Sequence, residues 1–114
     1  MKPKRCRVRF SAEAEKDFAR ILTDTRDNFG PRQVEIYRAT LREAIKRLEF
    51  GPEVLGSRAL DEVRRGLRVL HIARKGRRGR HLLAFRDDDG QMIEIIRILH
   101  DSMNIERHMP PGTD

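Results

Sequence analysis

The chain of 114 residues contains one cysteine, Cys6, and no tryptophan, and only 5% of its residues are aromatic. A single cysteine excludes an internal disulfide and a cysteine-based zinc cluster, and such a residue in a strand is usually a small buried hydrophobic group. No apolar run approaches the roughly 20 residues of a membrane span. The N-terminal residues also lack the apolar region of a secretory signal. We therefore expect a soluble, cytoplasmic protein with no membrane partner.

Sequence motifs of the common catalytic classes are also missing. The chain has no glycine-rich phosphate loop, no cysteine or serine nucleophile in a recognisable setting, and no histidine or carboxylate spacing typical of a metal site. We therefore expect no cofactor, no metal ion and no catalytic residue that a motif alone would identify.

Basic residues are abundant and unevenly placed. The net charge is +7, and both the hydrophobic and the charged fractions are 38%. The length suits one domain over residues 1–114, but the apolar share is low for a domain that covers its own core, which favours a partner. A cationic surface attracts nucleic acid or an acidic protein. The excess is concentrated in ten residues: Arg58, Arg64, Arg65, Arg68, Arg74, Lys75, Arg77, Arg78, Arg80 and Arg86.

The first half of the chain predicts a strand followed by two helices. Residues 5–10 alternate between arginine and apolar side chains, which is typical of a half-buried strand. Ser11 is a good helix N-cap, and an apolar face follows at helical spacing: Ala14, Phe18, Ile21, Leu22, Thr25 and Phe29. Gly30 ends this helix and Pro31 begins the next. We place the second buried face on Val34, Tyr37, Leu41, Ala44 and Leu48, in an antiparallel hairpin.

The second half predicts three strands, at residues 66–74, 80–86 and 91–100, after a packed loop at 51–65. A basic turn at 75–80 joins the first two strands, and a turn ending in Asp-Gly joins the last two. The last strand is the most apolar, so we place it centrally, with the first strand of the chain beside it. A strand, a helical hairpin and an antiparallel meander form an α+β fold, with the helices on one face of the sheet.

Histidines and one arginine of these strands are the residues with chemical potential. His71, His81 and His100 fall on different strands and could converge, so that one moves a proton at a phosphodiester while arginines stabilise the developing charge. The more common role of such histidines is that of a satisfied polar residue at a strand end. Arg97 interrupts the most apolar strand, so it either pairs with a carboxylate, Glu94 or Asp101, or points at a ligand.

Several segments, taken in their order and spacing, form a recognisable pattern: residues 10–18, 28–30, 66–68, 81–86 and above all 96–104. The chain resembles the ParE/RelE superfamily of toxins from type II toxin–antitoxin systems along almost its whole length. The block from Arg97 to His100 looks like the ParE branch. Two features depart from the family pattern: Phe85 stands where a tyrosine is common, and the basic turn at 75–80 is longer and more cationic.

The resemblance implies a cognate antitoxin of the ParD type, a DNA-binding dimer whose extended segment wraps the toxin and alone carries it to operator DNA. ParE-like toxins act on DNA gyrase and block replication without catalysis. The alternative is a RelE-like endonuclease that cuts mRNA in the ribosome. It loses support because the single tyrosine, Tyr37, is placed in the helical core. A plain nucleic-acid-binding module is disfavoured because no stacking aromatics accompany the arginines.

On this basis we assign expected roles to individual residues. The target-facing set is Arg68, Arg86, Arg97 and His100, with help from residues 101–108. The antitoxin-facing set is Phe18, Leu22, Arg64, Arg65 and Arg74. Were the chain a RelE-like nuclease, the catalytic set would be His71, His81, His100, Arg86 and Arg97.

Overall fold

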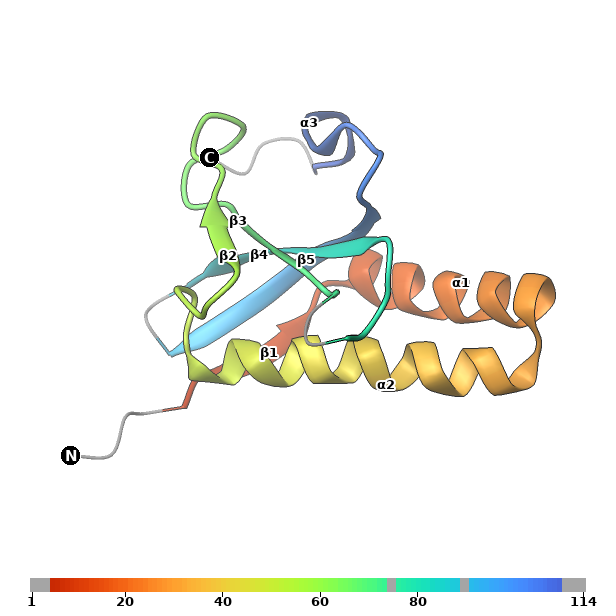
Figure 1. Ribbon diagram of the computed structural model, residues 1–114. Coiled ribbons are helices and arrows are strands. Elements are labelled where there is room, and N and C mark those ends of the chain that lie inside the picture. The colour runs from red at the N-terminus through yellow and green to blue at the C-terminus, as the bar shows by residue number, and fades with distance from the viewer. Residues whose placement is uncertain (1–4, 74–75, 89–90, 110–114) are drawn as a thin grey trace.

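The computed structural model describes residues 5–73, 76–88 and 91–109. A five-stranded mixed sheet has the order β1-β5-β4-β3-β2, and two long helices pack as a hairpin on one of its faces (Figure 1). This confirms the α+β fold, in which the apolar stripe of each helix is buried against a sheet. No helix among these residues is long and apolar enough to cross a membrane.

The hairpin consists of α1 (Ala12–Phe29) and α2 (Pro31–Arg47), followed by a 3-10 turn, η1 (Leu48–Phe50). The side chain of Ser11 accepts a hydrogen bond from the backbone N–H of Ala14 at 3.0 Å, so it caps α1 as predicted. Gly30 adopts a φ of 93°, which an L-residue with a side chain rarely takes, and lets the chain reverse before Pro31. Because the reversal takes one residue, the two helices are forced into contact along their length.

The strands are β1 (Arg7–Phe10), β2 (Ser57–Ala59), β3 (Arg68–His71), β4 (His81–Asp87) and β5 (Met92–His100). The last three form the predicted antiparallel meander. β2, inside the segment predicted to be a loop, adds an edge strand to β3. β5 lies inside the sheet, between β4 and β1, as predicted, and the additional edge strand β2 puts β4 in the middle position. β1 pairs with β5 in parallel.

Helix α1 completes the edge of β5 that β1 leaves open. β1 pairs with β5 only as far as Phe10 opposite Ile95. Beyond that point, the Ser11 hydroxyl donates to the Ile96 carbonyl at 2.7 Å, and the backbone N–H of Ile98 donates to Asp17 Oδ2 at 2.9 Å. Buried backbone polar groups need hydrogen-bond partners. The side chains of Ser11 and Asp17 supply the partners for this edge of β5 that a longer β1 would have supplied.

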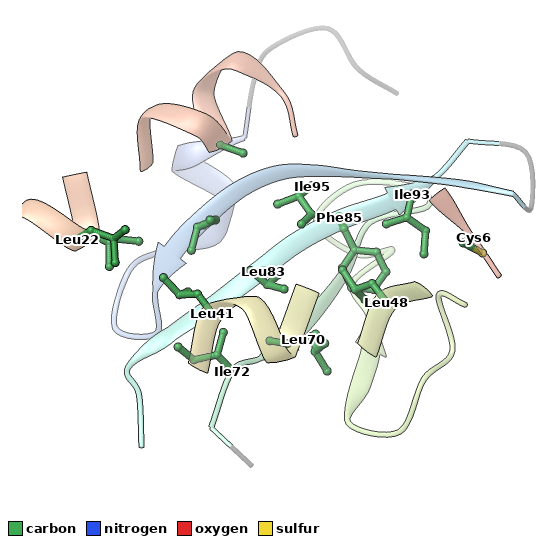
Figure 2. Close-up of a cluster of buried hydrophobic side chains, with 14 of the residues drawn as sticks. Cys6, Leu22, Leu41, Leu48, Leu70, Ile72, Leu83, Phe85, Ile93 and Ile95 are labelled. Carbon is green, nitrogen blue, oxygen red and sulfur yellow. The ribbon is translucent and has the colours of Figure 1, made fainter. Parts of the chain in front are cut away.

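Most of the core lies between the sheet and the helical hairpin (Figure 2). Phe85 and Leu83 from β4 and Ile93 and Ile95 from β5 pack there, all completely buried. Leu41 and Leu48 cover them from the second helix and η1. Cys6 is buried in the same cluster, as predicted.

A smaller cluster covers the opposite face of the sheet. Its buried residues are Leu60, Leu67, Val69, Leu82, Ala84, Leu99 and Met109. They come from the loop before β3, the sheet, and the segment after the short helix α3 (Ile105–His108), which begins at an Asn104 cap. The loop around Leu60 and Val63 therefore packs down as predicted, but Leu55, which was expected to pack with them, is 72% exposed.

One residue predicted for the buried face of the first helix is exposed. Phe29, assigned to the buried face of the first helix, is 74% exposed. The hairpin turn extends beyond the sheet (Figure 1), so the last turn of α1 has no strand to cover it.

Candidate functional site

A cavity of about 910 Å³ opens where the hairpin turn, the β3–β4 connection and the ends of β4 and β5 meet. Ile21, Thr25, Phe29 and Tyr37 give it apolar walls from both helices. Its other side is polar or cationic, formed by Ala73, Arg77, Arg78, Gly79, Arg80, His81 and His100, with Asp24, Asn28 and Gln33 on the helices. Concave apolar sites with a few polar groups are the usual places where proteins bind ligands or peptide segments.

Tyr37 and His81 form a hydrogen-bonded pair in the wall of this cavity. The Tyr37 hydroxyl accepts from the backbone N–H of Arg80 at 3.2 Å and contacts His81 Nδ1. This contact places the Tyr37 hydroxyl against one ring nitrogen of the imidazole, so each group is the other's hydrogen-bond partner. Burial raises the pKa of Tyr37, so the hydroxyl stays protonated at neutral pH.

His81 is held neutral by its surroundings. Burial, followed by the nearby charge of His100, lowers the pKa of His81 from 6.5 to about 4. The His81 and His100 rings are packed edge to face, with centroids 5.4 Å apart. A neutral imidazole avoids repelling the arginines beside it, and the lowered pKa makes His81 a weak base at neutral pH.

The remaining strand-end histidines are fixed by short-range contacts. His100 Nδ1 lies 2.7 Å from the Ser102 hydroxyl and accepts from the Ser102 backbone N–H at 3.1 Å. His71 Nε2 lies 2.9 Å from Asp101 Oδ2, and Arg80 Nε donates to the same carboxylate at 3.1 Å. The hydrogen bond from His71, assisted by Arg80, lowers the pKa of Asp101. The structure therefore brings all three predicted histidines to one end of the sheet.

Arg97 does pair with a carboxylate, but the partner is neither of the two that were predicted. Its Nε and Nη2 atoms donate to the two oxygens of Asp17 at 2.7 and 2.9 Å. Glu94 instead contacts Arg9 and Arg86, and Asp101 contacts His71 and Arg80. Because Asp17 is a helix residue 80 positions away, proximity in sequence could not identify it.

The Asp17–Arg97 pair is nearly enclosed. The side chain of Asp17 is 1% exposed and that of Arg97 is 17% exposed. Burial acts to raise the pKa of Asp17, but hydrogen bonds from Arg97 and the Ile98 N–H outweigh it, so the net pKa lies below 3.8. Arg97 Nη1 also donates to the His108 carbonyl at 3.1 Å, which connects the pair to α3.

The other residues expected to face the target already have protein partners. Arg68 Nε donates to the Pro52 carbonyl at 2.8 Å, and its Nη2 donates to the Ser57 hydroxyl at 2.9 Å. Arg86 lies 3.1 Å from Asp88 and 3.6 Å from Glu94. Of the four predicted target-facing residues, His100 is the one that lines the cavity.

The residues expected to face the antitoxin do not gather in one place. Leu22 is only 9% exposed and packs in the main core. Phe18 is half-buried beside Phe10, their ring centroids 6.0 Å apart. Arg64 and Arg65 belong to the loop between β2 and β3. Arg74 and Lys75 lie outside the described residues, so only the later part of the basic turn at 75–80 is placed.

Sequence reasoning missed Tyr37 as a member of the site. The helical spacing correctly predicted that Tyr37 lies on the buried face of α2, since Tyr37 packs against the main core. Periodicity does not tell where the end of a long side chain projects, and here the hydroxyl reaches the cavity. The sequence holds no local signal for this, and the contact appears only in the folded chain, where Gly79 lies against the Tyr37 hydroxyl. A Cβ on Gly79 would lie 3.2 Å from the Tyr37 hydroxyl and 2.6 Å from Ile72 Cδ1.

Residues 8–105 match the family described as "ParE toxin of type II toxin-antitoxin system, parDE". The chain belongs to the ParE toxin family. It is 32% identical over 103 residues to Toxin ParE1 from two strains of Mycobacterium tuberculosis, CDC 1551 / Oshkosh and H37Rv, covering 90% of this chain and 97% of each relative. It is therefore a toxin of the type II toxin–antitoxin class.

Two solved structures share the fold of this ParE-family chain. One is the chromosomal ParDE system from P. aeruginosa, with a TM-score of 0.69 and 21% identity, covering 83% of this chain and 95% of the other. The second is the toxin–antitoxin complex RelBE2 from Mycobacterium tuberculosis, with a TM-score of 0.56 and 24% identity, covering 87% and 94%.

Proposed function

We propose that this ParE-family toxin inhibits DNA gyrase and so blocks replication, and that a ParD-like antitoxin keeps it inactive. Family membership and the likeness to a ParDE system support this proposal. The observation that carries the antitoxin half is the large cavity beside the hairpin turn, with apolar walls and an arginine rim. An extended acidic segment with leucine or valine anchors has the chemistry to fill it.

Such a segment would make two kinds of contact in the cavity, apolar and charged. Ile21, Phe29 and Tyr37 offer apolar surface to an aliphatic anchor, and burial of that surface supplies most of the affinity. Arg77, Arg78 and Arg80 would meet its acidic residues, which speeds association and selects the partner. The exposed Phe29 ring is the largest apolar group that such a partner would cover.

For the target we keep His100 and the three arginines, in different roles. His100 lines the cavity and belongs to the candidate contact surface. Arg68, Arg86 and Arg97 are held by protein groups, so they position the strands on which that surface stands. Met103, which is 40% exposed and lines an adjoining cavity with His100, extends the surface toward α3.

A second candidate function is the RelE-like mRNA endonuclease, and the cluster of Tyr37, His81 and His100 favours it. These groups line the same cavity as three arginines. Cleavage at a phosphodiester needs a group that moves a proton and cations that stabilise the charged transition state. The position of Tyr37 removes one argument that the sequence offered against this function.

The deciding experiment is a gyrase supercoiling assay run beside a ribosome-dependent mRNA cleavage assay on the same purified chain. Lost supercoiling with intact mRNA supports the proposal, and cleaved mRNA with normal supercoiling supports the second candidate. The variant Tyr37→Phe separates them further, because loss of the hydroxyl should lower a cleavage rate but leave gyrase inhibition within about twofold. A calorimetric titration with the protein encoded by the neighbouring gene tests the antitoxin half, and no complex would refute it.

A further inference from the structure

A second, more polar cleft of about 450 Å³ runs along the outer side of α2. Arg38, Arg42 and Lys46 line it at intervals of four residues, so they form a row about 12 Å long on one helix face. Arg77 completes the cleft from the β3–β4 connection, and the other lining residues are Glu35, Ala39 and Glu43.

The cations of this cleft outnumber the carboxylates, and two of the four have no carboxylate or hydrogen-bond partner among the described residues. Among the described residues, Arg42 and Lys46 have no carboxylate partner, and both are exposed. Glu35 lies 3.5 Å from Arg38. Arg77 Nη1 donates to the buried Thr40 hydroxyl at 3.2 Å, which fixes its guanidinium against the helix. Four cations and two carboxylates leave a charge of about +2 on a small surface.

The chemistry of the cleft discriminates between its possible occupants. Protein interfaces depend on buried aromatic and aliphatic anchors, but Ala39 is the only apolar residue in this lining. Single-stranded nucleic acid needs aromatic side chains for base stacking, and the lining contains none. A row of cations with a net positive charge and neither of these features suits the closely spaced phosphates of a duplex.

We infer that the outer face of α2 contacts the phosphate backbone of duplex DNA without reading its sequence. The surface adjoins the cavity through Arg77, which lines both, so an antitoxin segment in the cavity and a duplex on α2 would be neighbours. This amends the expectation that the chain reaches operator DNA only through its antitoxin. Sequence recognition stays with the antitoxin, and the toxin adds a contact that depends on charge alone. The inference does not depend on gyrase being the target.

The test uses fluorescence anisotropy of the full chain with a labelled duplex of random sequence and about 20 base pairs, from about 50 to 200 mM salt. The variant Arg42→Ala/Lys46→Ala removes two cations that lie outside the cavity, and alanine preserves the helix. The matched control, Lys16→Ala/Arg26→Ala, removes the same charge from exposed positions of α1. Circular dichroism confirms the fold of each variant.

Each phosphate contact contributes about −0.9 to the slope of log affinity against log salt. We therefore expect the α2 variant to flatten that slope by about 1.8 and the control to leave it unchanged. Absence of duplex binding at the lowest salt would overturn the inference, as would equal flattening in both variants. A poly-glutamate peptide that binds as tightly as the duplex would also overturn it, because the surface would then select acidic protein.

Discussion

The substitution Asp17→Ala should cost the fold more than its position on a helix suggests. Asp17 accepts hydrogen bonds from Arg97, from Arg20 and from the backbone N–H of Ile98, and its side chain is 1% exposed. Alanine removes all of these contacts at once. It leaves a mostly enclosed guanidinium and an edge N–H of β5 without an acceptor.

The expected magnitude follows from these groups. Removing one partner of a buried ion pair costs about 3 to 5 kcal/mol. Because Arg97 keeps some access to water, we expect the loss of its partner to cost about 3 kcal/mol, the lower end of this range. The orphaned Ile98 N–H adds about 1 kcal/mol. Alanine returns about 0.5 kcal/mol through its better helix propensity. The free energy of unfolding of the variant should therefore be about 3 to 4 kcal/mol lower. This is a large share of the total for a typical protein, which is about 5 to 15 kcal/mol.

Urea denaturation followed by circular dichroism measures this loss. Because Asp17→Ala approaches the limit of stability, Asp17→Asn provides a second measurement. The amide keeps one acceptor, so its expected cost is about 2 kcal/mol. Glu13→Ala is the matched control on the same helix, since Glu13 makes an exposed pair with Lys16 and should cost less than about 0.5 kcal/mol.

The pH dependence gives an independent check. The pKa of Asp17 lies below 3.8 in the folded chain, so its contribution is complete above the unfolded pKa and is lost as pH falls through the folded value. Asp17→Asn should therefore flatten the stability profile below pH 3.8. A loss under about 1 kcal/mol for Asp17→Ala, equal to that of Glu13→Ala, would refute the idea that this carboxylate completes the sheet edge.

Three other positions give sharper tests of local structure. His81, whose pKa of about 4 lies below the unfolded 6.5, should destabilise the fold as pH falls between these values, by about 1 to 2 kcal/mol after allowance for partial exposure. His81→Asn should abolish that part of the loss in urea melts at pH 7 and 4.5, and an unchanged profile would contradict it. Gly79→Ala should cost about 1 to 3 kcal/mol in thermal melts, because its Cβ would meet Ile72 at 2.6 Å, and a neutral result would show that the loop yields freely. Ser11→Ala removes both a helix cap and the hydrogen bond to Ile96, so we expect a loss of about 1 to 2 kcal/mol, against a smaller loss for the exposed cap Asn104.

Local signals predicted the elements that depend on neighbouring residues. Ser11, Gly30 and Pro31 mark the helix ends because capping and backbone conformation are decided within a few residues. The meander was predictable for the same reason, since alternation and turn residues lie side by side in the sequence. β2 was not, because three residues, Ser57–Ala59, are too few to show a period.

Contacts between distant segments were beyond such signals. The partner of Arg97 was sought nearby, although Asp17 stands between Ala14 and Ile21 on the buried side of α1. A carboxylate inside an apolar stripe requires a cation or donor to compensate it, and that pattern was visible in the sequence. The prediction that Phe29 is buried was wrong because the helical periodicity continues beyond the point where the sheet under the helix ends.

The candidate site was predicted in part. The three histidines converge as the strand assignments allowed, because residues at the same ends of neighbouring antiparallel strands share an edge, and His81 lies opposite His100. The arginine rim followed from the basic turn. The hydroxyl of Tyr37 and the separation of α2 into a cavity face and a polar outer face depend on how the hairpin rests on the sheet, which no local pattern specifies.

The pairing of β1 with β5 affects when the chain can fold during its synthesis. Residues emerge from the ribosome N-terminus first, so β1 and Asp17 wait for a strand that lies about 80 positions later. Until Met92–His100 is made, β1 lacks its pairing partner, β4 lacks one of its two neighbouring strands, and Asp17 lacks the Ile98 N–H. A nascent chain that stops before Met92 thus cannot assemble this sheet. A cell that makes such a toxin is exposed to its activity only after translation has passed residue 100.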